Sequence, residues 1–198
     1  MYRRKDAFYT RAKATGYRSR AAFKLSQLAK QVRLFRRGDR VLDLGAWPGG
    51  WLQVAAELVG PSGRVVGVDL QGIEALTQPN VRTLVGDISD AETQRRMLEE
   101  CGGRVDVILS DLAPKLSGVR ARDEAQAEAL AQTVLAVAER MLRPGGNLLI
   151  KLFMGEAATR VVGQLRSRFA TVRTTRPQAT RKGSSEIYAI AIDFGRGE

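Results

Sequence analysis

The sequence reads RVLDLGAWPGGW at residues 40–51. The first five residues are typical of a buried strand, and Gly49–Val59 has the pattern of a helix. Gly45 lies in the turn between them, and Gly49 and Gly50 open the helix. Glycines at such a junction let the backbone approach a ligand closely. A strand, a glycine-rich turn and a helix in this order predict an α/β fold with its ligand at the carboxyl end of the first strand.

Strands and helices continue to alternate along the chain. Further strands are predicted at 65–69, 81–85, 105–110, 147–153, 171–175 and 187–194, and further helices at 91–101, 122–142 and 156–169. Such alternation predicts a Rossmann-like, mostly parallel seven-stranded sheet with helices on both faces, ending in an antiparallel hairpin. We expect one domain, residues 1–198, onto which a basic arm and helix (about 1–36) pack. Ser19 is the predicted cap of that helix, which runs to about Leu34.

Composition excludes several classes of catalyst and compartment. The chain has 198 residues with no histidine and a single cysteine, Cys101. Ser-His-Asp and Cys-His catalysis, an internal disulfide and the usual zinc sites are therefore excluded, and no metal is expected. No apolar stretch approaches the ~18 residues of a membrane span, and the first twenty residues lack the apolar block of a signal peptide. We expect a cytoplasmic protein with no membrane partner.

Positive charge is concentrated at the two ends of the chain. The net charge is +11, and residues 1–40 hold thirteen Lys/Arg against two acids. The run 157–185 adds seven cations without an acid, whereas residues 41–156 hold eleven cations and sixteen acids. Two basic segments flanking an acidic middle favour a nucleic-acid partner, because each phosphate contact releases counterions. The alternative is a solvated charged arm with no specific partner.

Aspartates follow three successive predicted strands. Asp69 ends the second strand, Asp87 follows the third and Asp111 follows the fourth, so all three should meet at one edge of the sheet. Three acids would repel a pyrophosphate, and the spacing of Gly45, Gly49 and Gly50 differs from the GxGxxG motif. Both observations disfavour a nicotinamide-dependent oxidoreductase. A ligand with a nucleoside and a positive charge fits better, and S-adenosylmethionine has both. Each aspartate taken singly has the alternative of a turn or helix-cap residue.

Three further charged residues lie in apolar surroundings. Lys151 interrupts the buried strand 147–153, where an unpaired ammonium is costly. The alternative is that its aliphatic stem carries the amine to solvent. Lys24 borders the apolar stripe of the first helix and could equally be a surface lysine. Glu186 opens the last strand, where an edge-strand charge that discourages aggregation is the alternative.

Five motifs together resemble the FtsJ/RlmE family of ribosomal RNA 2'-O-ribose methyltransferases. They are RSRAAFKL at 18–25, the loop 43–51, SDLAP at 110–114, the stretch from Gly145-Gly146 to Lys151, and SEIY at 185–188. The resemblance spans nearly the whole chain. It departs at Trp47, where the family loop usually has a small residue.

The resemblance implies a catalytic tetrad and a donor site. The tetrad falls on Lys24, Asp111, Lys151 and Glu186, and S-adenosylmethionine contacts fall on Gly49, Trp51, Asp69, Asp87 and Asp111. The implied reaction is methylation of a uridine ribose in the large-subunit (23S) rRNA, within the assembled subunit. Lys151 is expected to act as the base or to stabilise the alkoxide, and the sequence leaves these two roles open.

Other functions remain compatible with parts of the sequence. The same chemistry on a tRNA or an mRNA cap would use the same site, and a non-catalytic RNA-binding protein would explain the basic segments but not Lys151 in a buried strand. We expect a monomer whose partner is ribosomal RNA or the large ribosomal subunit.

Overall fold

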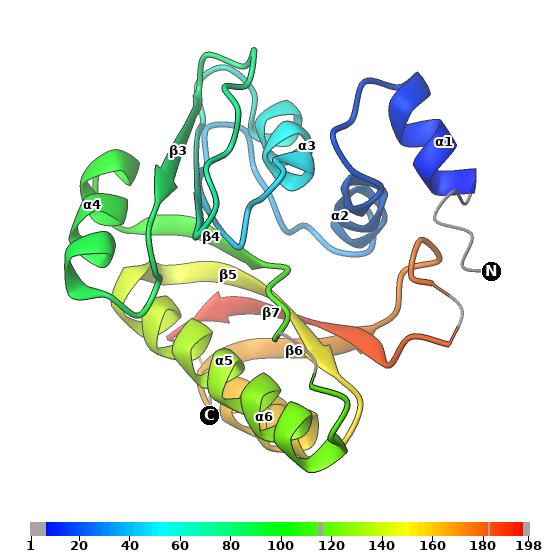
Figure 1. The fold of residues 1–198 in the computed structure, drawn as a ribbon. Coiled ribbons are helices and arrows are strands. Elements are labelled where there is room, and N and C mark those ends of the chain that lie inside the picture. The colour runs from blue at the N-terminus through cyan, green and yellow to red at the C-terminus, as the bar shows by residue number, and fades with distance from the viewer. Residues whose placement is uncertain (1–6, 115–116, 182, 196–198) are drawn as a thin grey trace.

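One seven-stranded sheet forms the centre of the molecule (Figure 1). The structure, a computed structural model, describes residues 7–114, 117–181 and 183–195. The strand order is β3-β2-β1-β4-β5-β7-β6; neighbours from β3 to β5 run parallel, and β7 runs antiparallel to β5 and β6. The strands are β1 Arg40–Leu44, β2 Arg64–Asp69, β3 Val81–Val85, β4 Val105–Ser110, β5 Leu142–Phe153, β6 Phe169–Thr175 and β7 Glu186–Phe194. The predicted fold class and hairpin are confirmed.

Helices cover both faces of the sheet, as predicted. They are α1 Ala7–Ala14, α2 Ala21–Ala29, α3 Gly50–Val59, α4 Ala91–Cys101, α5 Arg120–Met141 and α6 Glu156–Arg166. Helices α4, α5 and α6 share one apolar cluster with the sheet, and α2 and α3 share another on the opposite face. Alternate residues of β5 enter the two clusters, Leu148 and Ile150 the first and Leu149 the second, as the two-residue period of a strand requires. No helix among the described residues is long and apolar enough to cross a membrane.

The helix expected from Ser19 to Leu34 is shorter, so both of its predicted ends are wrong. Helix α2 begins at Ala21, after Arg20, and no side chain caps it. The chain turns after Ala29, and this turn brings Leu34 into the core with 1% of its surface exposed. There the Leu34 carbonyl accepts a hydrogen bond from Asn147 Nδ2 at 2.9 Å. The chain therefore leaves the helical conformation after Ala29, and this path buries Leu34. Helix α1 was not predicted, and residues 1–6 of the basic arm lie outside the described residues.

Smaller boundary differences have local causes. Helix α6 ends at Arg166 rather than Phe169, because Phe169 is buried and starts β6 opposite Phe194. Strand β5 begins at Leu142, so it includes the Pro144-Gly145-Gly146 segment that lies between the predicted helix 122–142 and the predicted strand 147–153. Its pairing with β4 shifts register between Val105 and Val107, which accommodates that segment. None of these differences moves the carboxyl edge of the sheet, where the candidate residues lie.

Candidate active site

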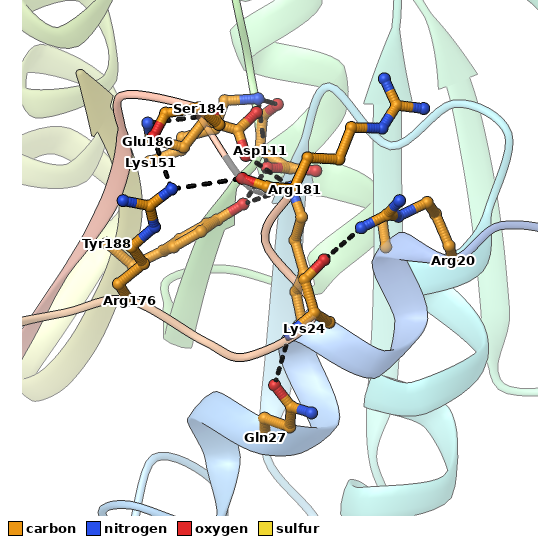
Figure 2. Close-up of polar contacts among 12 residues, drawn as sticks. Arg20, Lys24, Gln27, Asp111, Lys151, Arg176, Arg181, Ser184, Glu186 and Tyr188 are labelled. Carbon is orange, nitrogen blue, oxygen red and sulfur yellow. Dashed lines mark hydrogen bonds and ion pairs between the residues drawn. The ribbon is translucent and has the colours of Figure 1, made fainter. Parts of the chain in front are cut away.

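Two amine–carboxylate pairs face each other at the carboxyl edge of the sheet (Figure 2). Lys24 Nζ lies 2.9 Å from Glu186 Oε2, and Lys151 Nζ lies 3.2 Å from Asp111 Oδ1. Lys151 Nζ also donates to the backbone oxygen of Asp111 at 2.5 Å. The structure therefore brings together the four residues that the resemblance had selected from four distant motifs.

The sheet register explains why these side chains meet. Strand β5 pairs antiparallel with β7, with Lys151 opposite Tyr188 and Phe153 opposite Glu186. Asp111 directly follows β4, the other neighbour of β5. Lys24 comes from α2 and is itself buried against the same edge. Three strands and one helix thus fix the four groups from different directions.

Lys151 is held largely inside the protein. Its side chain is 6% exposed, and its amine contacts only the oxygens of Asp111 among the polar contacts shown in the described structure. An unpaired buried ammonium would cost several kcal/mol, which the Asp111 pair offsets. The alternative in which the lysine stem carries the amine to bulk water is excluded.

Tyr188 connects the two pairs and was not among the predicted site residues. It is fully buried, donates its hydroxyl proton to Asp111 Oδ1 at 2.7 Å and accepts from Lys24 Nζ at 3.2 Å. Burial raises its pKa, and the charge of Asp111 and the hydrogen bond to it raise that pKa further, so the phenol keeps its proton. The sequence signal was its position two residues after Glu186, on the same face of a strand.

The charge of Glu186 is set by competing effects. Burial pushes the pKa of Glu186 upward, but attraction to Lys24, the hydrogen bond from Lys24 and attraction to Lys151 outweigh burial, so the pKa lies below its ordinary value. The carboxylate is therefore ionised at neutral pH. Both amines contribute to this effect, which shows that the two pairs form one electrostatic unit.

The glycine-rich loop makes close contacts with neighbouring segments. Gly45 has φ +80°, and a Cβ there would lie 2.5 Å from Leu112 Cδ2. Gly49 has φ +107° beside Arg18, and a Cβ on Gly50 would lie 2.3 Å from Ser19 Oγ. Arg18 binds the loop by donating to the Pro48 carbonyl at 3.2 Å. The loop is thus held between the segment after β4 and the segment before α2.

The two loop tryptophans have different environments. Trp51 is buried, and its indole Nε1 donates to the Ala21 carbonyl at 2.8 Å, so its side chain ties α3 to α2. Trp47 is 52% exposed and precedes a cis bond to Pro48. Of the two tryptophans, Trp47, the departure from the family pattern, therefore presents the larger apolar surface to solvent.

The aspartates at the strand ends differ in their local bonds. Asp69 Oδ2 accepts from the Trp47 N–H at 3.0 Å, which joins β2 to the glycine-rich loop. Asp87 is exposed and accepts from the backbone and hydroxyl of Ser89, which lower its pKa. These bonds are those of a turn residue, the alternative role of this aspartate. A ligand-binding role of Asp87 therefore stays a prediction.

Asp43 was also missed, although it precedes the loop on β1. It is fully buried, and neither carboxylate oxygen has a hydrogen-bond partner among the described residues. Burial raises its pKa well above the ordinary value, and the charges of Asp111 and Asp69 raise it further. Asp43 lies on β1, between its neighbours β2, which Asp69 ends, and β4, which Asp111 follows.

This strand order, with an antiparallel β7 between β5 and β6 and acids at the strand ends, defines a Rossmann-like methyltransferase. Residues 17–194 match the sequence model of the FtsJ-like methyltransferases, and the chain belongs to that family.

Similar proteins agree with this assignment. The chain is 47% identical over 192 residues to "Ribosomal RNA large subunit methyltransferase E" of Methanothermobacter thermautotrophicus, covering 97% of this chain and 91% of that protein. It is 42% identical to the protein of the same name from Myxococcus xanthus, covering 96% and 90%. A solved ribosomal RNA methyltransferase from Plasmodium falciparum superimposes with a TM-score of 0.79 at 28% identity, covering 92% of this chain and 100% of that one. Aeropyrum pernix fibrillarin with bound S-adenosyl-L-methionine (TM-score 0.60, 21% identity, 86% and 76% covered) shares the fold.

Proposed function

We propose that the protein transfers a methyl group from S-adenosylmethionine to a ribose 2'-hydroxyl of large-subunit ribosomal RNA. The observation that carries this proposal is the joined array of Lys24, Glu186, Tyr188, Asp111 and Lys151 at the carboxyl edge of a methyltransferase sheet. The names of the relatives support ribosomal RNA as the substrate class.

The residues around the glycine-rich loop fit a cationic nucleoside donor. Positive φ angles at Gly45 and Gly49 bring bare backbone to the carboxyl end of β1. Asp69 lies beside this loop, because its carboxylate accepts a hydrogen bond from the Trp47 N–H. A carboxylate at this position suits hydrogen bonds to ribose hydroxyls. Asp69 and Asp111 supply negative charge that suits a sulfonium and an ammonium rather than a phosphate. Gly45, Gly49, Gly50, Trp51, Asp69, Asp87 and Asp111 are the proposed donor-binding residues.

The reaction requires alignment and the handling of one proton. The donor supplies an electrophilic methyl group. As the bond from the 2'-oxygen to that methyl forms and the sulfur–methyl bond breaks, the hydroxyl proton must leave, and negative charge grows on the oxygen before transfer is complete. A rigid array can contribute several kcal/mol through orientation alone, on the order of 7–11 in favourable cases. Lys151 is held by a hydrogen bond to the Asp111 backbone oxygen and an ion pair with the Asp111 carboxylate. It is the group that we assign to the reacting oxygen.

The geometry of Lys151 is compatible with either proposed role. Its amine donates one N–H to the Asp111 backbone oxygen and lies 3.2 Å from Asp111 Oδ1 as an ion pair, so two of its positions face Asp111. The remaining position on the nitrogen then holds a lone pair in the neutral amine, which can accept the hydroxyl proton, or a third N–H in the ammonium, which can stabilise the oxygen. Lys24 and Glu186 place the target ribose on the other side of Tyr188.

A transfer assay with three RNAs tests the proposal. Labelled methyl donor is offered to large ribosomal subunits, free ribosomal RNA and tRNA in parallel, and the modified ribose is then mapped. We expect label on a uridine of the large-subunit rRNA, with assembled subunits the preferred substrate. Labelling of tRNA instead would reassign the substrate, and absence of labelling on every RNA would contradict a catalytic function.

A further inference from the structure

Arg18 lies in the segment before α2, and its guanidinium binds two other segments of the chain. Besides the Pro48 carbonyl of the glycine-rich loop, it donates to the carbonyls of Glu74 and Ala75, at 2.7 and 2.6 Å. Glu74 and Ala75 lie between β2 and β3, in the segment that follows Asp69. One side chain therefore joins the glycine-rich loop to the segment that follows the proposed ribose-binding carboxylate.

The position of Arg18 is fixed at its backbone and along its side chain. Its N–H donates to Gln53 Oε1 at 2.9 Å, and Gln53 Nε2 donates to the Gly16 carbonyl at 3.0 Å. Gln53 belongs to α3, the helix that follows the glycine-rich loop. The Arg18 side chain lies against Gly49, where a Cβ would come within 3.2 Å of Arg18 Cδ. The guanidinium thus reaches its three carbonyls from a preorganised position.

The segment 70–80 depends on such contacts because it forms no helix or strand of its own. None of its residues is buried, and Ile73 and Leu76 are those that pack against the apolar cluster shared with α2 and α3. The loop and this part of the chain are joined at two places, by the Trp47–Asp69 hydrogen bond and by Arg18. A ligand that contacts both the loop and Asp69 requires the spacing between them to be fixed.

The hydrogen-bonding chemistry of arginine suits this position. A guanidinium carries five N–H groups in a planar fork, and Arg18 directs its fork at carbonyls from two segments. A lysine ammonium is a point charge and lacks this planar geometry. A positive charge does not by itself favour a cationic donor, so a gain in donor binding from Arg18 must come from the spacing that it fixes.

We propose that Arg18 is a positioning residue of the methyl-donor site. It holds the glycine-rich loop and the segment 70–80 at the spacing that lets the loop backbone and Asp69 contact one nucleoside. This inference rests on the proposed function. Arg18 acts through the protein carbonyls that it binds, and it is assigned neither to the reacting atoms nor to the RNA.

Arg18→Gln tests the inference, with Arg37→Gln as the matched control. Arg37 packs against Gly60 at the other end of α3 and donates to the Glu57 carbonyl at 3.3 Å, so it binds the same helix away from the glycine-rich loop. We expect Arg18→Gln to weaken binding of S-adenosylmethionine about tenfold in calorimetry, because a preorganised contact is lost. Arg37→Gln should leave the affinity unchanged. At saturating donor, kcat of Arg18→Gln should change by less than about twofold.

Two further measurements separate positioning from the other roles of a cation. S-adenosylhomocysteine lacks the sulfonium charge, so Arg18→Gln should weaken its binding by the same factor as that of S-adenosylmethionine. Arg18→Lys keeps the charge without the planar fork, and we expect it to weaken donor binding as well. The slope of log RNA affinity against log salt should equal that of the wild type in both variants, because no phosphate contact is lost.

Three results would overturn the inference. They are equal donor affinity in Arg18→Gln and Arg37→Gln, tighter binding of S-adenosylmethionine alone, and a reduced salt slope for RNA. Hydrogen exchange of the donor-free protein is an independent readout, since amides in 45–49 and 70–78 should exchange faster in Arg18→Gln, and unchanged exchange would also overturn it. If the wild type binds neither S-adenosylmethionine nor S-adenosylhomocysteine, the proposed function fails, and hydrogen exchange decides separately whether Arg18 joins the two segments.

Discussion

The Tyr188 hydroxyl donates a 2.7 Å hydrogen bond to Asp111 Oδ1. The same oxygen of Asp111 lies 3.2 Å from Lys151 Nζ, and the Tyr188 oxygen accepts from Lys24. One phenol therefore links the Lys24–Glu186 pair to the Lys151–Asp111 pair. Tyr188 is fully buried, so the two pairs share one hydrogen-bonding group that is shielded from solvent.

Tyr188→Phe should slow methyl transfer while the fold persists. The substitution keeps the buried ring but removes the group shared by Lys24 and Asp111, so we expect the single-turnover rate to fall by about 10- to 100-fold. The free energy of unfolding should fall by about 1 kcal/mol, the net value of a typical hydrogen bond. Tyr17→Phe, which removes an exposed hydroxyl bonded to Glu57, is the control and should leave the rate unchanged. Equal rates for both variants would contradict a linking role for Tyr188.

Lys151→Ala should separate chemistry from donor binding. The Lys151 amine contacts Asp111. In the proposed mechanism it faces the reacting oxygen, so the substitution removes a group needed for chemistry and leaves the glycine-rich loop in place. We expect the transfer rate to fall by about 10²–10⁴-fold and the affinity for S-adenosylmethionine, measured by calorimetry, to change little. A parallel loss of donor affinity and turnover would show that Lys151 belongs to the donor pocket.

Much of this arrangement could be predicted from local sequence. The loop 43–51 and the acids after β2, β3 and β4 follow from strand periodicity, and Lys151 was conspicuous because a charge interrupts a buried strand. Lys24 and Glu186 carry weak local signals, and only the resemblance joined them to the site. Their contact depends on the docking of α2 beside β7, which connects residues 162 positions apart.

Tertiary packing explains what sequence analysis missed. Tyr188 reads as an ordinary apolar strand residue until the β5–β7 register places it opposite Lys151. Asp43 reads as part of a strand, and its isolation from hydrogen-bond partners appears only in three dimensions. The premature end of α2 likewise depends on the burial of Leu34. In each case the deciding contact joins distant segments.

Glu186→Gln should destabilise the protein in a pH-dependent way. The folded pKa of Glu186 lies below its ordinary value, so its contribution to stability is present above the unfolded pKa, about 4.3, and is lost as pH falls through the folded pKa. Urea unfolding from pH 7 to pH 3 should show a gap between wild type and variant that is constant down to about pH 5 and then narrows. A gap that widens in acid would contradict the lowered pKa.

Gly45→Ala should disturb the donor loop and Asp111 together. The new Cβ would lie 2.5 Å from Leu112 Cδ2 at a φ of +80°, and Leu112 directly follows Asp111. We expect the free energy of unfolding to fall by about 2 kcal/mol and donor affinity to fall with it. Gly163→Ala, in an open position on α6, should instead raise stability by about 0.5–1 kcal/mol.

A second substitution separates the steric contact from backbone strain. Leu112→Ala removes the atoms that the Gly45→Ala methyl group would strike, so the double variant should recover donor affinity relative to Gly45→Ala alone. The strain of the left-handed φ remains in the double variant, and recovery should therefore be partial. Thermal unfolding with and without S-adenosylmethionine measures both quantities. Additive losses in the double variant would show that the Gly45–Leu112 contact does not couple the loop to Asp111.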